Sequence, residues 1–126
     1  MSQADEVLRE IERMIEDEFL PIIGPKKGNI LVKVIQEVKP KNILEVGTLI
    51  GYSAILMGKH LDKDVHLTSI EIHAEEAEIA KKNIARANIP PKIEVIVGDA
   101  KTIIPRLKGK FDLVFIDAAK TSILTT

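Results

Sequence analysis

The fold is decided by one run near the middle of the chain, Ile43-Leu44-Glu45-Val46-Gly47-Thr48-Leu49-Ile50-Gly51-Tyr52-Ser53-Ala54. Its first part is apolar and β-prone, which predicts a short strand over Asn42 to Val46. The glycines that follow allow a tight turn and a close approach of backbone to a ligand. The pattern from Tyr52 to His60 then predicts a helix, whose first N–H groups are free to bind.

Downstream of this run, strands and helices alternate. Strands are predicted at residues 65–70, 93–97 and 112–116, and helices at 74–87 and 101–107. In the alanine-rich helix 74–87 the glutamates come early and the lysines late, which suits the helix dipole. Three successive strand–helix–strand crossovers predict a parallel sheet of about four strands, with right-handed connections and helices on both faces. This is a doubly wound α/β unit.

Upstream of the run, apolar residues recur at helical spacing in two segments. The first helix is predicted over residues 5–19 and ends at Pro21. A turn over 24–28 follows, then a second helix that closes at Lys39-Pro40, because the residue before proline is pushed out of the α region. We therefore expect one domain over 1–126, with N-terminal helices at 5–39, an α/β core at 42–117 and an atypical tail at 118–126.

Composition limits the function classes. The chain has 126 residues, of which 45% are apolar and 29% charged, as in a globular domain. Its 18 basic and 19 acidic side chains nearly cancel, so the sequence gives no electrostatic sign of a nucleic-acid or membrane partner. The absence of cysteine excludes disulfides, thiolate zinc sites and cysteine nucleophiles. The acidic start, Met1 to Glu6, lacks an apolar signal core, so we expect a cytoplasmic protein.

Polar residues gather where the predicted strands end. Strand two ends in Glu71, whose carboxylate can accept hydrogen bonds from both hydroxyls of a ribose. Strand three ends in Gly98-Asp99-Ala100, and this carboxylate suits the exocyclic amine of an adenine. Strand four ends in Asp117. Ligands of such sheets bind beyond the carboxyl ends of the strands, although Glu71 and Asp99 taken singly are equally compatible with solvated helix caps.

Two other nucleotide-binding motifs are absent. A dinucleotide fingerprint starting at Gly47 would need glycines at the positions of Leu49 and Tyr52. A phosphate-binding loop would need a Gly-Lys-Ser/Thr run after the first strand, and none is present. A generic nucleotide-binding domain is therefore disfavoured.

The run 43–54 resembles the first motif of class I S-adenosylmethionine-dependent methyltransferases. More narrowly, it resembles the catechol and caffeoyl-CoA O-methyltransferase group, in which Tyr-Ser follows the glycine turn. The runs Val97-Gly98-Asp99-Ala100 and Phe115-Ile116-Asp117-Ala118-Ala119-Lys120 match the same group, as does Gly24-Pro25-Lys26-Lys27-Gly28. The likeness covers residues 5–120.

The resemblance implies a Rossmann-like sheet of order 3-2-1-4, the first part of a truncated seven-strand fold, and methyl transfer to a hydroxyl of a small molecule. It also implies a cofactor site. Glu71 would bind the ribose, Ile72 the adenine face and Ser53 the cofactor carboxylate. The methionine part would lie against Glu45 and the glycine turn, including Gly47, Thr48 and Gly51, and the adenine edge against Gly98, Asp99 and Ala100.

The family's aspartate at the position of Asp117 lies near the sulfonium and ligates Mg²⁺, which implies a catalytic and metal-binding role for Asp117. The family's two further metal ligands and most of its acceptor pocket would lie beyond residue 120, so the metal site is incomplete here. His60, His66 and His73 show no ligand spacing, and we expect no metal role for them. Whether the chain is catalytic or is a non-catalytic cofactor-binding or self-association module stays open.

The tail, Thr121 to Thr126, departs from the family pattern, and we expect no strand-and-helix continuation in it. Strand four would then be an exposed apolar edge, which invites pairing with a second chain. We therefore expect a homodimer or higher homo-oligomer, with the contact near residues 111–126 or at the two N-terminal helices. The competing expectation is a monomer whose tail folds back across the edge.

Overall fold

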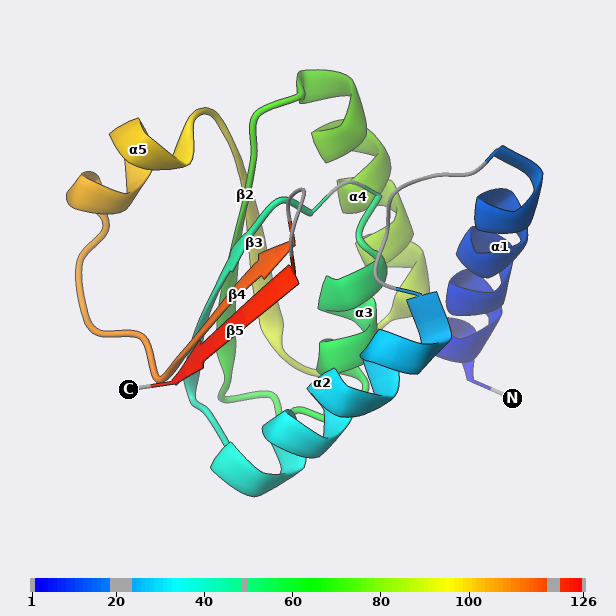
Figure 1. Ribbon diagram of the computed structural model, residues 1–126, viewed down its shortest axis with the longest axis horizontal. Coiled ribbons are helices and arrows are strands. Elements are labelled where there is room, and N and C mark those ends of the chain that lie inside the picture. Colours follow the sequence, from blue (N-terminus) through cyan, green and yellow to red (C-terminus); the bar gives the residue numbers. More distant parts are fainter. Residues whose placement is uncertain (1, 19–23, 49, 118–120, 126) are drawn as a thin grey trace.

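A computed structural model describes the backbone at residues 2–18, 24–48, 50–117 and 121–125, and the side chains at 2–14, 28–48 and 50–116. The elements in chain order are α1 (Gln3–Glu18), α2 (Gly24–Val38), β1 (Asn42–Val46), α3 (Tyr52–Gly58), β2 (His66–Glu71), α4 (Ala74–Ala87), β3 (Lys92–Val97), α5 (Ala100–Ile103), the 3₁₀ turn η1 (Ile104–Arg106), β4 (Leu113–Asp117) and β5 (Thr121–Thr125). Figure 1 shows them as a twisted sheet flanked by helices.

The predicted strands and helices are present, with two corrections. The helix predicted over 101–107 is the short α-helix α5 followed by the 3₁₀ turn η1. The segment 24–28, predicted as a turn, is instead the start of α2. Pro25 is compatible with this because proline is tolerated in the first turn of a helix, where its missing N–H costs nothing. Pro21, the predicted end of the first helix, lies outside the described residues.

The sheet has the order β3-β2-β1-β4-β5. Strand β1 pairs in parallel with β2 and with β4, and β2 pairs in parallel with β3. The predicted order of the first four strands is therefore confirmed. Because β1 and β2 lie inside the sheet, the glycine turn that follows β1 and the residue that ends β2 come to the middle of its carboxyl edge.

The expected exposed edge at β4 is wrong, because the tail forms a fifth strand. Strand β5 runs antiparallel to β4, with Phe115 opposite Ile123. Thr121, Ile123 and Thr125 are β-branched residues, which favour extended backbone. Their pairing gives the backbone N–H and C=O groups of β4 partners within the same chain, so the tail fold-back that competed with dimerisation is what the structure shows.

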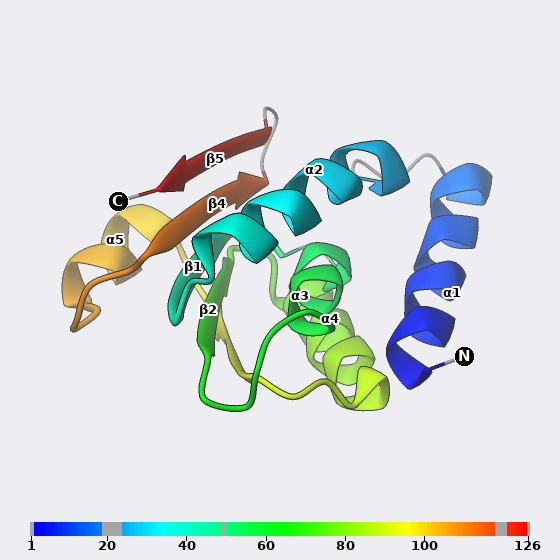
Figure 2. The ribbon, with the colours of Figure 1, turned by 90° about the horizontal axis from the view of Figure 1, so that it is seen from below.

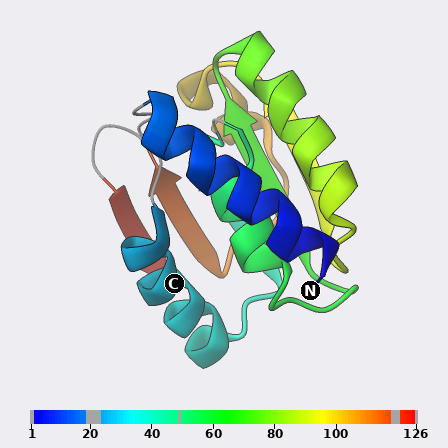
Figure 3. The same cartoon turned by 90° about the vertical axis from the view of Figure 1, so that its right-hand side faces the viewer.

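Helices cover the two faces of the sheet unequally. Helices α2, α3 and α4 lie on one face, whereas the short α5 lies on the other (Figure 2). Helix α1 packs against α3 and α4 on the side away from the sheet, in front of α3 and alongside α4 (Figure 3). The core lies between the sheet and the larger helical layer, and its most deeply buried side chains include Leu31, Ile35, Ile43, Ile55, Met57, Leu67, Leu113 and Phe115. Burying each of these contributes about 1.5–3 kcal/mol.

Within the described part of the chain, no helix is long and apolar enough to cross a membrane.

Candidate ligand site at the carboxyl edge of the sheet

The ends of three neighbouring strands are held together at one edge of the sheet. The Gly47 N–H, just past β1, donates to the carbonyl of Ile70 in β2 at 2.8 Å. The Gly98 N–H, just past β3, donates to the carbonyl of Glu71 at 2.9 Å. The structure therefore brings together the glycine turn, Glu71 and the residues after β3, as the positions of these residues predict.

The turn after β1 needs glycine for its backbone conformation. Gly47 and Gly51 have φ of 87° and 88°, in the left-handed region. The Gly51 N–H donates to the carbonyl of Thr48 at 2.8 Å, which closes the turn. A side chain at Gly51 would place its Cβ 3.2 Å from the carbonyl oxygen of Ala80 in α4, so helix packing as well as φ excludes a larger residue.

Helix α4 holds this turn with a side chain that the sequence analysis missed. The Asn83 amide Nδ2 donates to the carbonyl of Ile50 at 2.8 Å. A half-buried asparagine in the middle of a helix carries no motif, and only the packing of α4 on the turn reveals its role. Asn83 thereby ties Ile50, next to Gly51, to α4.

Thr48 carries a buried hydroxyl without a partner. Its residue is 2% exposed, and Oγ1 is one of two buried side-chain oxygens in the described part of the chain that make no hydrogen bond, the other being Glu76 Oε2. An unpaired buried hydroxyl costs free energy that a partner can recover. Thr48 is therefore suited to a polar ligand group at the turn.

Below the turn, Glu45 is a fully buried carboxylate with hydroxyl donors on both oxygens. The Ser69 hydroxyl donates to Oε1 at 2.7 Å, and the Ser53 hydroxyl donates to Oε2. Ser53 lies at the start of α3, as predicted, whereas Ser69 lies in β2 and was not predicted. The Ser53 hydroxyl is therefore directed at Glu45.

Tyr52, part of the motif after the glycine turn, joins this region to α1. Its hydroxyl donates to Glu12 Oε2 at 2.5 Å, although the tyrosine is almost fully buried. Burial, and then the hydrogen bond to the negatively charged Glu12, raise the pKa of the Tyr52 hydroxyl above its usual range. Tyr52 therefore stays neutral and acts as a tie between α3 and α1.

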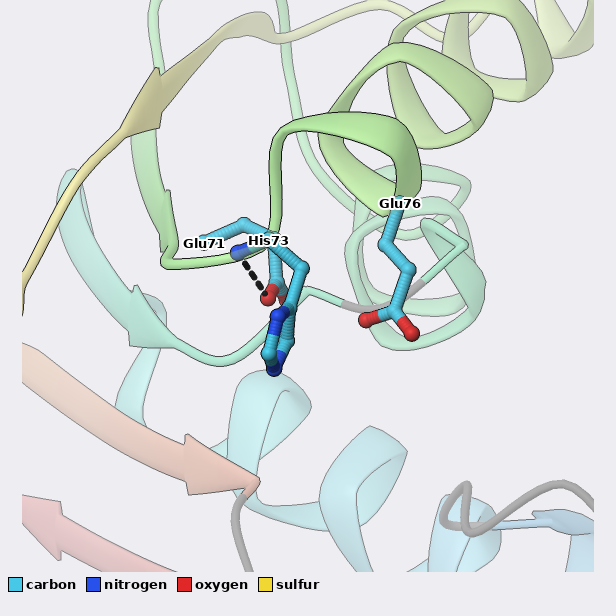
Figure 4. A group of neighbouring side chains, drawn as sticks. All are labelled: Glu71, His73 and Glu76. Atoms are coloured by element: carbon cyan, nitrogen blue, oxygen red, sulfur yellow. Dashed lines mark hydrogen bonds between the residues drawn. The ribbon is translucent and has the colours of Figure 1, made fainter.

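Glu71, His73 and Glu76 gather where β2 leads into α4, with one donor atom of each lying within 4.8 Å of the others (Figure 4). Glu71 is 3% exposed, and its Oε2 accepts a hydrogen bond from the His73 backbone N–H at 3.0 Å. The spacing of the three histidines gives no sign of this group, since the neighbours of His73 here are two glutamates. A cation here would take the same Glu71 oxygens as a ribose, so the two ligands would compete.

The residues after β2 and β3 are more open to solvent. Ile72 is 60% exposed, a large fraction for an isoleucine. Asp99 is exposed, and its Oδ1 accepts a hydrogen bond from the Lys101 N–H at 2.9 Å, which makes Asp99 the N-cap of α5. Gly98 and Ala100 flank it. Asp117 closes β4, but its side chain lies outside the described residues, so its role rests on the sequence.

Four parallel strands in the order β3-β2-β1-β4, with a glycine turn and a buried carboxylate at their carboxyl edge, define a Rossmann-like domain. The particular family follows from comparison with known proteins. The model of the O-methyltransferase family matches residues 1–125, and the chain belongs to that family. This confirms the resemblance drawn from the motifs.

Individual relatives agree with this assignment. A catechol O-methyltransferase of Niastella koreensis is 37% identical over 122 residues, covering 92% of this chain and 55% of the relative. A solved O-methyltransferase of Streptomyces achromogenes, in complex with SAM (S-adenosylmethionine), has a TM-score of 0.80 at 32% identity, covering 91% and 54%. One from Bacillus cereus, in complex with SAH (S-adenosylhomocysteine), has a TM-score of 0.76 at 34% identity, covering 94% and 55%. The chain thus spans about half the length of these relatives.

Proposed function

We propose that the chain binds S-adenosylmethionine at the carboxyl edge of its sheet, as the cofactor-binding part of an enzyme that methylates a hydroxyl of a small molecule. The observation that carries this proposal is the buried carboxylate of Glu71 at the end of β2, beside the turn from Gly47 to Gly51. Ribose offers two adjacent hydroxyls, and a carboxylate can accept a hydrogen bond from both. The SAM and SAH complexes of the solved relatives support this choice of ligand.

The rest of the edge fits the two ends of this ligand. The exposed Ile72 offers an apolar surface to the adenine face, with Gly98, Asp99 and Ala100 at the adenine edge. The buried Thr48 hydroxyl and the Glu45–Ser53 pair lie at the glycine turn, where we place the methionine part. When bound, the cofactor supplies a methyl group on a positively charged sulfur. The residues of this chain fix its position and orientation.

We further propose that Asp117 contributes one carboxylate to a Mg²⁺ site and lies at the reacting end of the cofactor. Its place at the end of β4, the strand next to β1, supports this role. Magnesium takes oxygen ligands in octahedral geometry, so one carboxylate leaves most positions to other oxygens. The acceptor hydroxyl would be one such oxygen, and a bound divalent cation would favour its deprotonated form.

A second candidate is a cofactor-binding module without turnover. The observation that favours it is that the described residues of the carboxyl edge are all assigned to the cofactor, and none of them to an acceptor. Under this alternative the chain binds the cofactor as proposed but transfers no methyl group to catechol, the acceptor class named by several relatives. The two candidates therefore share the binding site and differ only in turnover.

We also propose that the chain self-associates through its N-terminal helices, since β5 already covers the other predicted contact. The exposed apolar side chains of Met14 in α1 and Ile30 in α2 support this contact. Sedimentation equilibrium at micromolar concentration should give about twice the chain mass of 14.0 kDa. A mass near 14.0 kDa would instead show a monomer.

Isothermal titration calorimetry tests the binding proposal. The chain should bind SAM and SAH more tightly than NAD⁺, with one site per chain. Titrations with and without Mg²⁺ then report whether the cation strengthens binding, and a methyl-transfer assay with catechol separates the two candidates. Equal or weaker binding of SAM relative to NAD⁺ would overturn the proposed function.

A further inference from the structure

The carboxylate below the glycine turn receives its two hydroxyl donors from different elements. Ser53 belongs to α3, directly after the turn, and Ser69 belongs to β2. In the parallel pair of β1 and β2, Glu45 lies opposite Ser69, so the two side chains share one face of the sheet. Both serines are at least as buried as a core leucine, with exposures of 1% and 0%.

These two donors differ in what else they can reach. Ser53 begins the helix next to the turn, where the methionine part of the cofactor is placed. Its single hydroxyl proton can lie on Glu45 or on a ligand oxygen, but not on both at once. Ser69 is fixed in the interior of β2, two residues before the strand ends at Glu71. Its hydroxyl donates to Glu45 Oε1 at 2.7 Å, away from the turn.

A second hydrogen-bond donor stabilises a carboxylate that is buried away from water. A charge away from water is strongly disfavoured unless hydrogen bonds compensate it, and donors to a charged group contribute more than donors to a neutral one. If the Ser53 proton turned to a ligand, Glu45 would lose one of these bonds. The Ser69 bond reduces that loss, since it keeps Oε1 satisfied and holds the carboxylate in place.

We propose that Ser69 is a positioning residue of the cofactor site, which holds Glu45 toward the glycine turn and thereby allows the Ser53 hydroxyl to turn to the bound ligand. Ser69 does not itself touch the ligand. This inference rests on the proposed function and extends it to a residue outside the glycine motif. It predicts an effect confined to ligands that carry the amino-acid end.

The test compares Ser69→Ala with the parent by titration calorimetry, using SAH and methylthioadenosine as ligands. SAH carries the amino-acid end, whereas methylthioadenosine lacks it and keeps the nucleoside. We expect Ser69→Ala to bind SAH roughly ten-fold more weakly, on the scale of one hydrogen bond to a charged group. Its affinity for methylthioadenosine should stay within about two-fold of the parent, a difference below the scale of one such bond.

Two further variants distinguish loss of the Ser69 hydroxyl from a change in side-chain packing. Ser69→Thr keeps the donor and should restore SAH affinity to within about three-fold of the parent, since β-branched residues suit a strand. Thr68→Val removes a hydroxyl from the neighbouring position, which faces the other side of the sheet, and should change neither affinity. Should Ser69→Ala fail to fold, the Thr and Cys variants at position 69 give the same comparison of a strong and a weak donor.

The outcomes are distinguishable. If the parent binds neither SAM nor SAH, the proposed function itself fails. If the parent binds SAH and Ser69→Ala binds it equally well, the proposed function stands and the role of Ser69 is refuted. Equal weakening of SAH and methylthioadenosine by Ser69→Ala would also refute it, because that result indicates a general disturbance of the sheet.

Discussion

Carboxylates at the ends of neighbouring strands have very different surroundings in this protein. Glu45 and Glu71, on the two central strands β1 and β2, are almost completely buried and accept hydrogen bonds from protein donors. Asp99, after the edge strand β3, is exposed and caps a short helix. All three are carboxylates at or near the carboxyl end of a strand. Whether the strand lies inside the sheet or at its edge decides whether the carboxylate is buried and held or solvated.

Removing the most buried carboxylate should have the largest effect. Glu45→Ala leaves the hydroxyls of Ser53 and Ser69 without their acceptor in a buried place, which we expect to lower the free energy of unfolding by about 3 kcal/mol. Urea unfolding followed by circular dichroism measures the loss. The control is Glu94→Ala, which removes an exposed glutamate of β3 and should cost less than about 0.5 kcal/mol. Equal losses in Glu45→Ala and Glu94→Ala would contradict the claim that burial makes Glu45 more important for stability.

At the end of β2, the expected loss is in ligand affinity. Glu71→Ala should weaken SAM binding by about 1.5–3 kcal/mol, the scale of hydrogen bonds to a charged group. Calorimetry measures the change, with Glu75→Ala as the control, since Glu75 is an exposed acid in the first turn of α4. If Glu71→Ala binds SAM as tightly as the parent, the ribose assignment is wrong.

Replacing the exposed Asp99 should have a smaller effect on both the free energy of unfolding and the affinity for SAM. Asp99→Ala removes the N-cap of α5, and we expect a loss of about 0.5–1 kcal/mol in the free energy of unfolding. Its effect on SAM affinity should be smaller than that of Glu71→Ala, because water already screens the aspartate. A larger loss of affinity in Asp99→Ala would reverse the order that burial predicts.

The smallest effect on stability is expected for Asp5, a carboxylate in α1 away from the carboxyl edge of the sheet. The hydrogen bond from Lys59, more than that of Ser2, lowers the pKa of Asp5 to about 2. A lowered pKa stabilises the fold above the unfolded pKa near 3.9, and this stabilisation is lost as the pH falls through the folded value. Because the pair is partly exposed, Asp5→Asn should cost less than about 1 kcal/mol at pH 6.

The pH dependence of this variant provides its check. The difference in urea midpoint between Asp5→Asn and the parent should shrink as the pH falls from about 6 toward 2, since the parent's carboxylate then becomes protonated. A difference that is constant over this range would show that the loss at Asp5→Asn is not electrostatic.

The local sequence was enough to predict most of the helices and the first four strands, and the family resemblance supplied the order of those strands. Apolar periodicity marks α4 over Ala74–Ala87, and the glycines after Val46 mark the turn, because both are properties of short stretches of chain. The same local logic identified Glu71 and Asp99 as candidates. Local sequence could not show which of the two carboxylates is the more buried. Burial depends on which strands lie inside the sheet, and that is a property of the whole fold.

Tertiary structure decided the remaining features. The sequence predicts an open edge at β4, but only the structure shows that the tail Thr121–Thr125, which carries no motif, pairs with that edge. The bonds from Ser69 to Glu45 and from Asn83 to the glycine turn link residues 24 and 33 positions apart. Such contacts arise when separate elements pack, and a serine in a strand or an asparagine in a helix carries no local sign of the partner it will meet.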